Sequence, residues 1–236
     1  MNKIEQSWVD NAAKRTNNML EYQNWFDECK FLEECVKNGF IDFTTRIFTK
    51  DFYKVMGDPR NKSCLEIGFG GGRLLNASSK FFKTVYGVDI LNDACIKTTS
   101  EFLKSSGTKN FKLLHRDQAN IIGDKTIDFV YSFIVFQHLS SWEEANNYLK
   151  FIHRVLVDGG AGIIYFGLNT TNSNFYITEE SKFNARECSL FTTEDFVCNK
   201  MKNMFDILEV GRTTKKEWLD TKSGQFYVKF KKSGGK

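Results

Sequence analysis

The stretch Cys64-Leu65-Glu66-Ile67-Gly68-Phe69-Gly70-Gly71-Gly72-Arg73 decides how this chain folds. It joins a short apolar run at 63–67 to an amphipathic segment at about 72–82, which predicts a strand, a glycine-rich turn and a helix. Glycines allow the backbone to turn tightly and to approach a ligand that any Cβ would repel. The free amides at the start of the helix would then face that ligand.

The same alternation of strand and helix continues towards the C-terminus. Apolar runs typical of strands occupy 63–67, 84–89, 111–114, 127–133 and 162–168, with helical patterns between them at about 72–82, 92–106 and 142–157. Near-continuous apolar strands that alternate with helices indicate a parallel sheet covered on both faces, and right-handed crossovers make it doubly wound. A helix from 192 to about 205 and two antiparallel strands near 206–212 and 225–231 complete a predicted Rossmann-like, seven-stranded α/β sheet.

Residues 1–57 lack strand-like alternation and predict a helical extension, followed by a ligand-binding domain at 58–236 within one structural domain overall. Two helical stripes support the extension, one through Trp8, Ala12, Arg15 and Met19 and one through Trp25, Cys29, Leu32 and Val36. Gly39 suits a helix end, and a further helix is expected over 44–56.

Composition narrows the class of protein. Among 236 residues, 41% are hydrophobic and 26% charged, a globular balance. The net charge of +4 and the absence of a long basic run argue against a nucleic-acid partner.

No signal-peptide core and no apolar run of about 18 residues is visible, so we expect a cytoplasmic protein without membrane insertion. The six cysteines have no metal-ligand spacing, and we expect reduced thiols rather than a disulfide framework and no metal site. The sequence is silent on oligomeric state.

The type of ligand is indicated by two carboxylates. Asp89 ends a predicted strand about 20 residues beyond the glycines, where it can accept both hydroxyls of a ribose, although an Asp there can also cap a helix. Glu66 precedes the first glycine by two residues. A carboxylate beside the turn would repel a pyrophosphate, but it suits a cofactor that carries a sulfonium and an ammonium group.

At this point the sequence resembles the class I S-adenosylmethionine-dependent methyltransferases, whose first motif is an acid-x-Gly-x-Gly-x-Gly turn. Glu66, Gly68, Gly70 and Gly72 fit that motif. The resemblance implies S-adenosyl-L-methionine as cofactor, with S-adenosyl-L-homocysteine as product. It also implies cofactor-binding roles beyond the turn: Asp89 at the ribose, Ile90 beside the adenine, Asp117 at the adenine amino group, Gln118 as a backbone donor, and Phe133 at the methionine end.

The resemblance covers about residues 60–232, with Asp158 where a proline is commoner. It is closest to bacterial methyltransferases of small-molecule type that share the segment Val135-Phe136-Gln137-His138, which implies a small-molecule or glycan-related acceptor. In that family an extension such as 1–57 commonly folds over the cofactor and shapes the acceptor pocket. The chain's single proline, Pro59, excludes the proline-containing motifs of DNA methyltransferases.

His138 is the candidate catalytic base, because it follows the fourth predicted strand at the edge where open α/β sheets bind ligands. A structural histidine at a helix start is an equal alternative. Arg73 could reach the cofactor carboxylate or lie on the surface, and Tyr176 and Arg186 lie in a long polar loop at 169–190 that could meet the acceptor.

Two other functions stay open. One is a nicotinamide-dependent oxidoreductase, whose Tyr-x-x-x-Lys pattern occurs at Tyr227 and Lys231, but within a predicted strand. The other is a non-catalytic subunit that keeps the methyltransferase fold.

Overall fold

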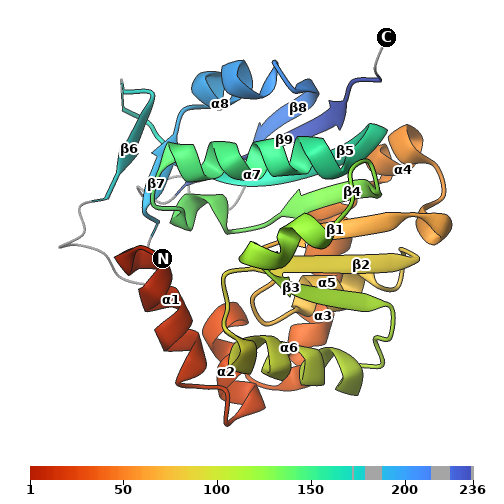
Figure 1. Ribbon diagram of the computed structural model, residues 1–236, viewed down its shortest axis with the longest axis vertical. Coiled ribbons are helices and arrows are strands. Elements are labelled where there is room, and N and C mark those ends of the chain that lie inside the picture. The colour runs from red at the N-terminus through yellow and green to blue at the C-terminus, as the bar shows by residue number, and fades with distance from the viewer. Residues whose placement is uncertain (172, 179–187, 214–223, 235–236) are drawn as a thin grey trace.

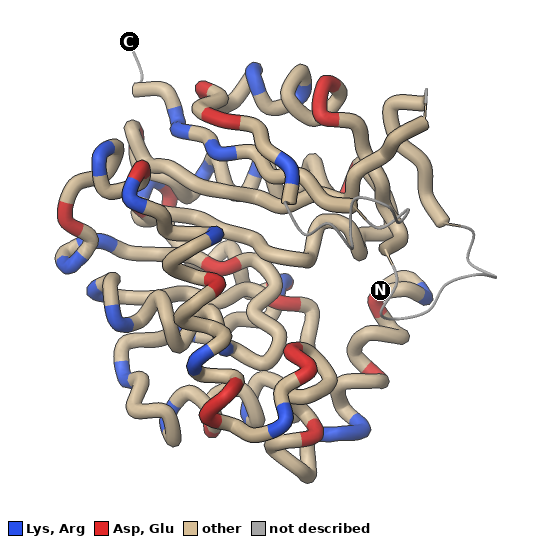
Figure 2. Tube along the Cα trace, turned by 180° about the vertical axis from the view of Figure 1, so that it is seen from behind, with Lys and Arg blue, Asp and Glu red and all other residues tan. Residues whose placement is uncertain are grey.

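The protein is described by a computed structural model over residues 1–171, 173–178, 188–213 and 224–234. A mostly parallel sheet lies between layers of helices, with α7 across one face and α3 and α5 behind the other (Figure 1). Acidic and basic residues are interspersed along the described trace (Figure 2). In the part of the chain that is described, no helix is both long and apolar enough to cross a bilayer.

The central strands run in the order β3-β2-β1-β4-β5, all parallel, and antiparallel β9 and then β8 follow on the far side of β5. This is the predicted seven-stranded sheet with an antiparallel edge. The strands are β1 Ser63–Ile67, β2 Thr84–Asp89, β3 Phe111–His115, β4 Ile127–Ser132, β5 Leu156–Leu168, β6 Phe175–Ile177, β7 Leu190–Thr192, β8 Phe205–Arg212 and β9 Gln225–Lys232.

The sheet has two strands more than the sequence predicts. β6 and β7 form a short antiparallel pair: β6 lies within 169–190, a range predicted to be a loop, and β7 starts at the last residue of that range. β7 also pairs with the last two residues of β5. Their segments are three residues each, too short for a period-two pattern to stand out in the sequence. Tyr176 lies on β6, whereas Arg186 lies outside the described residues.

The helices alternate with the strands as expected from the 3.6-residue pattern. They are α1 Lys3–Ala13, α2 Met19–Asp27, α3 Leu32–Asp42, α4 Lys50–Met56, α5 Arg73–Ser78, α6 Asp93–Ser105, α7 Trp142–Val155 and α8 Glu194–Met201. α7 begins at its Ser141 cap, whose hydroxyl accepts the amide of Glu144. It ends at Val155, and β5 starts at Leu156, two residues before the predicted stop at Asp158.

Side chains of successive strand residues enter opposite hydrophobic layers. Leu65 packs into the layer under α7 and α8, and its neighbour Cys64 into the layer under α3, α4 and α5. Both residues are almost fully buried. Because each central strand is covered on both faces, its apolar residues run on without alternation, which is the pattern seen in the sequence.

The N-terminal extension is helical, as predicted, but the two predicted stripes do not each form one helix. A turn separates α1 from α2, and another separates α2 from α3, where Glu28 has a left-handed backbone with φ of 53°. Gly39 is interior to α3 rather than at its end. A Cβ on Gly39 would lie 2.4 Å from the carbonyl oxygen of Arg73, so this glycine allows α3 to pack closely against the start of α5. A π-helical turn, Phe43–Ile47, precedes α4.

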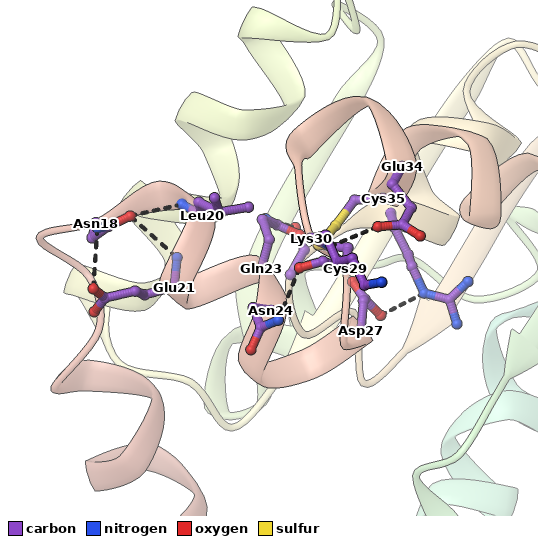
Figure 3. The surroundings of a disulfide bond; sticks show 12 residues. Asn18, Leu20, Glu21, Gln23, Asn24, Asp27, Cys29, Lys30, Glu34 and Cys35 are labelled. Atoms are coloured by element: carbon purple, nitrogen blue, oxygen red, sulfur yellow. Dashed lines mark hydrogen bonds and ion pairs between the residues drawn. A yellow bond between two sulfur atoms is a disulfide. The ribbon is translucent and has the colours of Figure 1, made fainter.

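The expectation that all cysteines are reduced is wrong for one pair. Cys29 and Cys35 form a disulfide between the turn after α2 and the first turns of α3 (Figure 3). Both cysteines are buried. The predicted continuous helix through Cys29 would have separated the two thiols by almost two turns. The break at Glu28 instead reverses the chain and brings their Cα atoms to 5.5 Å.

Candidate active site

A cavity of about 490 Å³ lies at the carboxyl ends of β1, β2 and β4, under the N-terminal helices. In parallel sheets this edge is where ligands bind. Because the sequence predicts that a cofactor binds at this edge, we call this cavity the cofactor cavity. Its wall contains Glu5, Trp8, Trp25, Phe26, Asp27, Glu28, Asp42, Arg46, Glu66, Gly68, Phe69, Gly70, Gly71, Arg73, Leu74, Asp89, Ile90, Leu91, Phe133, Ile134, Val135, His138, Leu139, Glu144 and Tyr148.

The glycine turn bends as the sequence predicts. Gly68, Gly70 and Gly72 have φ angles of 77°, 48° and 89°, a left-handed region that favours glycine. A Cβ on Gly68 would lie 2.3 Å from Cγ2 of Val135 in the segment after β4. Gly72 is the cap residue of α5 and approaches Thr99 of α6 rather than the cavity. The turn therefore requires glycine for close backbone packing as well as for its conformation.

The N-terminal helices pack directly on this turn. A Cβ on Gly70 would lie 2.9 Å from the ring of Phe26, and the amide of Gln23 donates to the carbonyl of Gly71 at 2.7 Å. Gln23 is fully buried. α2 thus closes the glycine turn from outside, a contact that no local sequence pattern predicts.

Glu66 is 2% exposed, and the Tyr131 hydroxyl donates to its Oε2 at 3.0 Å. Burial raises the pKa of this carboxyl well above its usual value, although the Tyr131 hydrogen bond and the charge of Arg73 work in the opposite direction. A cation placed beside Glu66 would favour its ionised form. The side chain is therefore suited to a positively charged ligand.

Asp89 ends β2 with its carboxylate held by backbone donors. Gly70 donates to Oδ2 at 2.9 Å, and Ile90 donates to Oδ1 at 2.7 Å. Burial raises the pKa of Asp89, and these amides lower it. The hydrogen bond from Gly70 joins the ends of β1 and β2 and fixes the carboxylate at the cavity wall.

Arg73 is buried in an ion-pair network. Its Nε donates to Asp27 at 2.5 Å and its Nη1 to Asp42 at 2.6 Å, and its side chain is 12% exposed. A surface position for Arg73 is therefore wrong. Burial disfavours the charged form of Arg73, but the two carboxylates raise its pKa above the usual value. The network ties the start of α5 to the ends of α2 and α3.

The segment after β4 completes the wall. The guanidinium groups of Arg46 and Arg73 lie over the ring of Phe133, each 6.0 Å from the ring centre. Ile134 has a φ of 59°, which is a strained conformation for a β-branched residue and typical of functional sites. His138 lies in a 3-10 turn, Phe136–His138, and its ring meets Trp8 edge-to-face at 4.8 Å.

The predicted site residues are thus brought together, with three exceptions. Glu66, Gly68, Gly70, Asp89, Ile90, Phe133 and His138 line the cavity, whereas Gly72, Asp117 and Gln118 do not. The side chain of Asp117 is 78% exposed in the turn Arg116–Ile121, where its backbone amide donates to His115. The sequence predicted where β3 ends. It did not predict in which direction the side chains of the following turn point.

Sequence patterns did not identify the cavity residues of the extension. The ring of Trp25 forms edge-to-face contacts with the rings of Trp8 and Phe26, with ring centres 4.9 Å and 4.7 Å apart, respectively. α1 is anchored across the cavity by Glu5, which forms an ion pair with Arg116. The helical stripe through Trp8 indicated a packed face, but not that this face would cover a ligand site.

Comparisons with known proteins agree with this geometry. Residues 65–164 match a family model described as a methyltransferase domain. A comparison with curated protein sequences finds no match. Among solved structures, the N-methyltransferase NodS from Bradyrhizobium japonicum WM9, in complex with S-adenosyl-L-homocysteine, is similar with a TM-score of 0.63 at 11% identity. The alignment covers 96% of this chain and 98% of NodS.

Two further structures extend the likeness. The 1,6-didemethyltoxoflavin-N1-methyltransferase of Burkholderia thailandensis has a TM-score of 0.61 at 14% identity, over 95% of this chain and 89% of that chain. An S-adenosylmethionine-dependent methyltransferase from Methanosarcina mazei has a TM-score of 0.60 at 16% identity, over 80% of this chain and 99% of that chain. The chain thus has the fold of these S-adenosylmethionine-dependent methyltransferases, and its residues 65–164 match a methyltransferase domain.

Proposed function

We propose that this protein transfers the methyl group of S-adenosylmethionine to a small organic acceptor held beneath the N-terminal helices. The proposal rests on one observation, the cavity in which the glycine turn, Glu66 and Asp89 meet the residues after β4. Bound there, the cofactor supplies an electrophilic methyl group on a positively charged sulfur.

The charges of the wall fit this cofactor. Carboxyl groups outnumber cations, which are Arg46 and Arg73, and the carboxyl-bearing residues are Glu5, Asp27, Glu28, Asp42, Glu66, Asp89 and Glu144. Such a wall favours a ligand with an ammonium and a sulfonium group, and disfavours the two phosphates of a nicotinamide dinucleotide. This difference supports the methyltransferase over the oxidoreductase.

Individual residues have roles that follow from their positions. Asp89 would accept the ribose hydroxyls at the end of β2, next to Ile90 at the adenine. Glu66 would offset the positive charge of the cofactor. Arg46 would bind the cofactor carboxylate, because Arg73 already donates to two carboxylates while Arg46 pairs with Asp42 alone at 3.3 Å.

Methyl transfer from sulfur is an in-line displacement, so the chain must align the acceptor and exclude water. α1, α2 and α3 cover the cavity and would perform that exclusion, which gives the extension 1–57 the role of a cap. The space under this cap suits a small molecule or a glycan fragment. His138 would accept the proton of an oxygen acceptor as the new bond forms.

Binding of S-adenosyl-L-homocysteine and of NADH, measured by titration calorimetry, tests the choice of cofactor. We expect S-adenosyl-L-homocysteine to bind and NADH not to bind. Glu66→Ala and Asp89→Ala should abolish the binding of S-adenosyl-L-homocysteine while circular dichroism stays that of the folded protein. Tighter binding of NADH, or unchanged affinity in both variants, would refute the proposal.

His138 is tested separately, since cofactor binding does not require a base. We expect His138→Asn to lower the rate of transfer of labelled methyl to an accepted substrate by tenfold or more, with cofactor affinity within about twofold of wild type. A wild-type rate in this variant would leave His138 as a structural residue packed against Trp8.

A further inference from the structure

A second cavity, of about 340 Å³, lies between the start of α4 and the strands β5 and β9. Thr45, Arg46 and Thr49 contribute to its wall from the N-terminal extension, and Tyr165 and Tyr227 from the sheet. We call it the side cavity.

The side cavity adjoins the cofactor cavity. Arg46 lines both, and the Tyr165 hydroxyl donates to the Arg46 carbonyl at 3.0 Å. The ring of Phe133 in the cofactor cavity meets the ring of Tyr165 in the side cavity, with centres 4.8 Å apart. A ligand in the side cavity is therefore separated from the cofactor cavity by about the thickness of one side chain.

The two cavities have opposite charge. Arg46, Lys50, Arg212 and Lys229 line the side cavity, with Asp51 as its one carboxylate among the described residues. The cofactor cavity is lined mostly by carboxyl groups. Neighbouring cavities of opposite sign would attract different ligands, one cationic and one anionic.

The carboxylates that pair with these cations stand mostly outside the wall. Arg212 pairs with Glu194 at 3.0 Å, and Lys229 with Glu209 at 2.6 Å, and neither Glu194 nor Glu209 lines the side cavity. Lys229 also pairs at 3.8 Å with Asp51, which does line it. The ion pairs hold the two basic side chains in place and leave each of them further N–H donors. A bound anion could accept from them without breaking these pairs.

One residue of the same wall, Thr49, carries a neutral donor. The Oγ1 of Thr49 is buried and has no hydrogen-bond partner in the described part of the chain. Thr49 precedes α4, yet its side chain does not cap that helix. A buried hydroxyl without a partner costs free energy, which a ligand oxygen accepting from it would recover. Lys50, the next residue, is exposed and brings a positive charge to the same rim.

We propose that the methyl acceptor carries a carboxylate, which the side cavity binds through Lys50, Lys229 and the Thr49 hydroxyl. The acceptor then extends past Tyr165 towards Phe133, with its nucleophilic atom in the cofactor cavity. This inference rests on the proposed function. It adds to it a substrate class, an organic acid rather than an amine or a neutral compound.

The test compares three probes of one size and different charge, which are benzoate, benzamide and benzylamine. Each is titrated into the protein saturated with S-adenosyl-L-homocysteine, and binding is followed by ligand-observed NMR. We expect benzoate to bind at least tenfold more tightly than the other two, and more weakly as salt is raised. Equal binding of the three, preference for benzylamine, or no binding of benzoate would overturn the inference.

Variants locate the binding site. Lys50→Glu should weaken benzoate binding at least tenfold, and Thr49→Val by a smaller factor. Lys54→Glu is the matched control, because Lys54 lies on the same helix but does not line the side cavity. Equal effects of the two lysine variants would overturn the inference. Binding of S-adenosyl-L-homocysteine to the wild-type protein is measured separately by calorimetry. If the wild-type protein does not bind it, the proposed function is refuted rather than the acceptor class.

Discussion

Arg73, the residue directly after the glycine turn, donates to Asp27 at the end of α2 over 2.5 Å, although 46 positions separate them in the sequence. The Oδ2 atom of Asp27 is buried and has no hydrogen-bond partner within the described chain. Burial raises the pKa of Asp27, and the charge of Arg73 lowers it. One ion pair thus joins the end of α2 to the helix that starts at the glycine turn.

Loss of this pair should destabilise the whole fold. Arg73→Met leaves Asp27 without its cation and Asp42 paired with Arg46 alone, and we expect it to reduce the free energy of unfolding by about 3–5 kcal/mol. Urea denaturation measures the change. Arg60→Met is the control: Arg60 forms an exposed pair with Asp58, so its loss should cost far less stability than that of Arg73. Equal effects of the two variants would contradict a structural role for the buried pair.

The raised pKa of Glu66 predicts a pH dependence of stability. Between the usual value of 4.5 and the higher value in the folded protein, the unfolded chain has lost this proton while the folded chain retains it. Stability should therefore fall as pH rises through this window, by at most about 1.4 kcal/mol per pH unit. Glu66→Gln removes the titration, so its advantage over wild type in urea denaturation should grow from pH 4.5 upwards. Parallel curves would refute the assignment.

Gly68 should tolerate alanine less well than another glycine of similar backbone conformation. Gly107 has a φ of 76° and open space where a Cβ would stand, so Gly107→Ala should cost only the left-handed strain of about 1–2 kcal/mol. Gly68→Ala adds a clash with Val135, which we expect to cost about 1–3 kcal/mol more. Adding Val135→Ala should restore part of that loss. Denaturation of the four proteins checks this, and equal losses for the two glycines would contradict it.

The Cys29–Cys35 disulfide should stabilise the cap. A chain closed over so few residues contributes about 2 kcal/mol by the loop-entropy model. Reductant should lower the unfolding free energy of the wild type by this amount and leave a Cys29→Ser, Cys35→Ser double variant unchanged. Cys198→Ser, which alters a free cysteine on α8, serves as control and should respond to reductant as the wild type does. A wild-type protein indifferent to reductant would show that the bond carries no stability.

The sequence determined the parallel sheet, because its evidence is local. Each central strand is a continuous apolar run, and each helix has a periodic apolar pattern. The turn from Glu66 to Gly72 has glycines at a spacing that indicates a tight turn of the backbone. The right-handed crossover rule then indicated that the sheet is doubly wound. The edge at which ligands bind followed from the sheet, and most of the site residues predicted from the sequence line the cavity there.

Tertiary structure alone decided how the first 57 residues complete the site. The packing of Phe26 on Gly70, the burial of Arg73 between two carboxylates and the Cys29–Cys35 bond depend on contacts that spacing does not encode. The same holds for the exposed position of Asp117. Periodicity indicates which face of a segment is buried, but the partner of that face is chosen by packing over the whole chain.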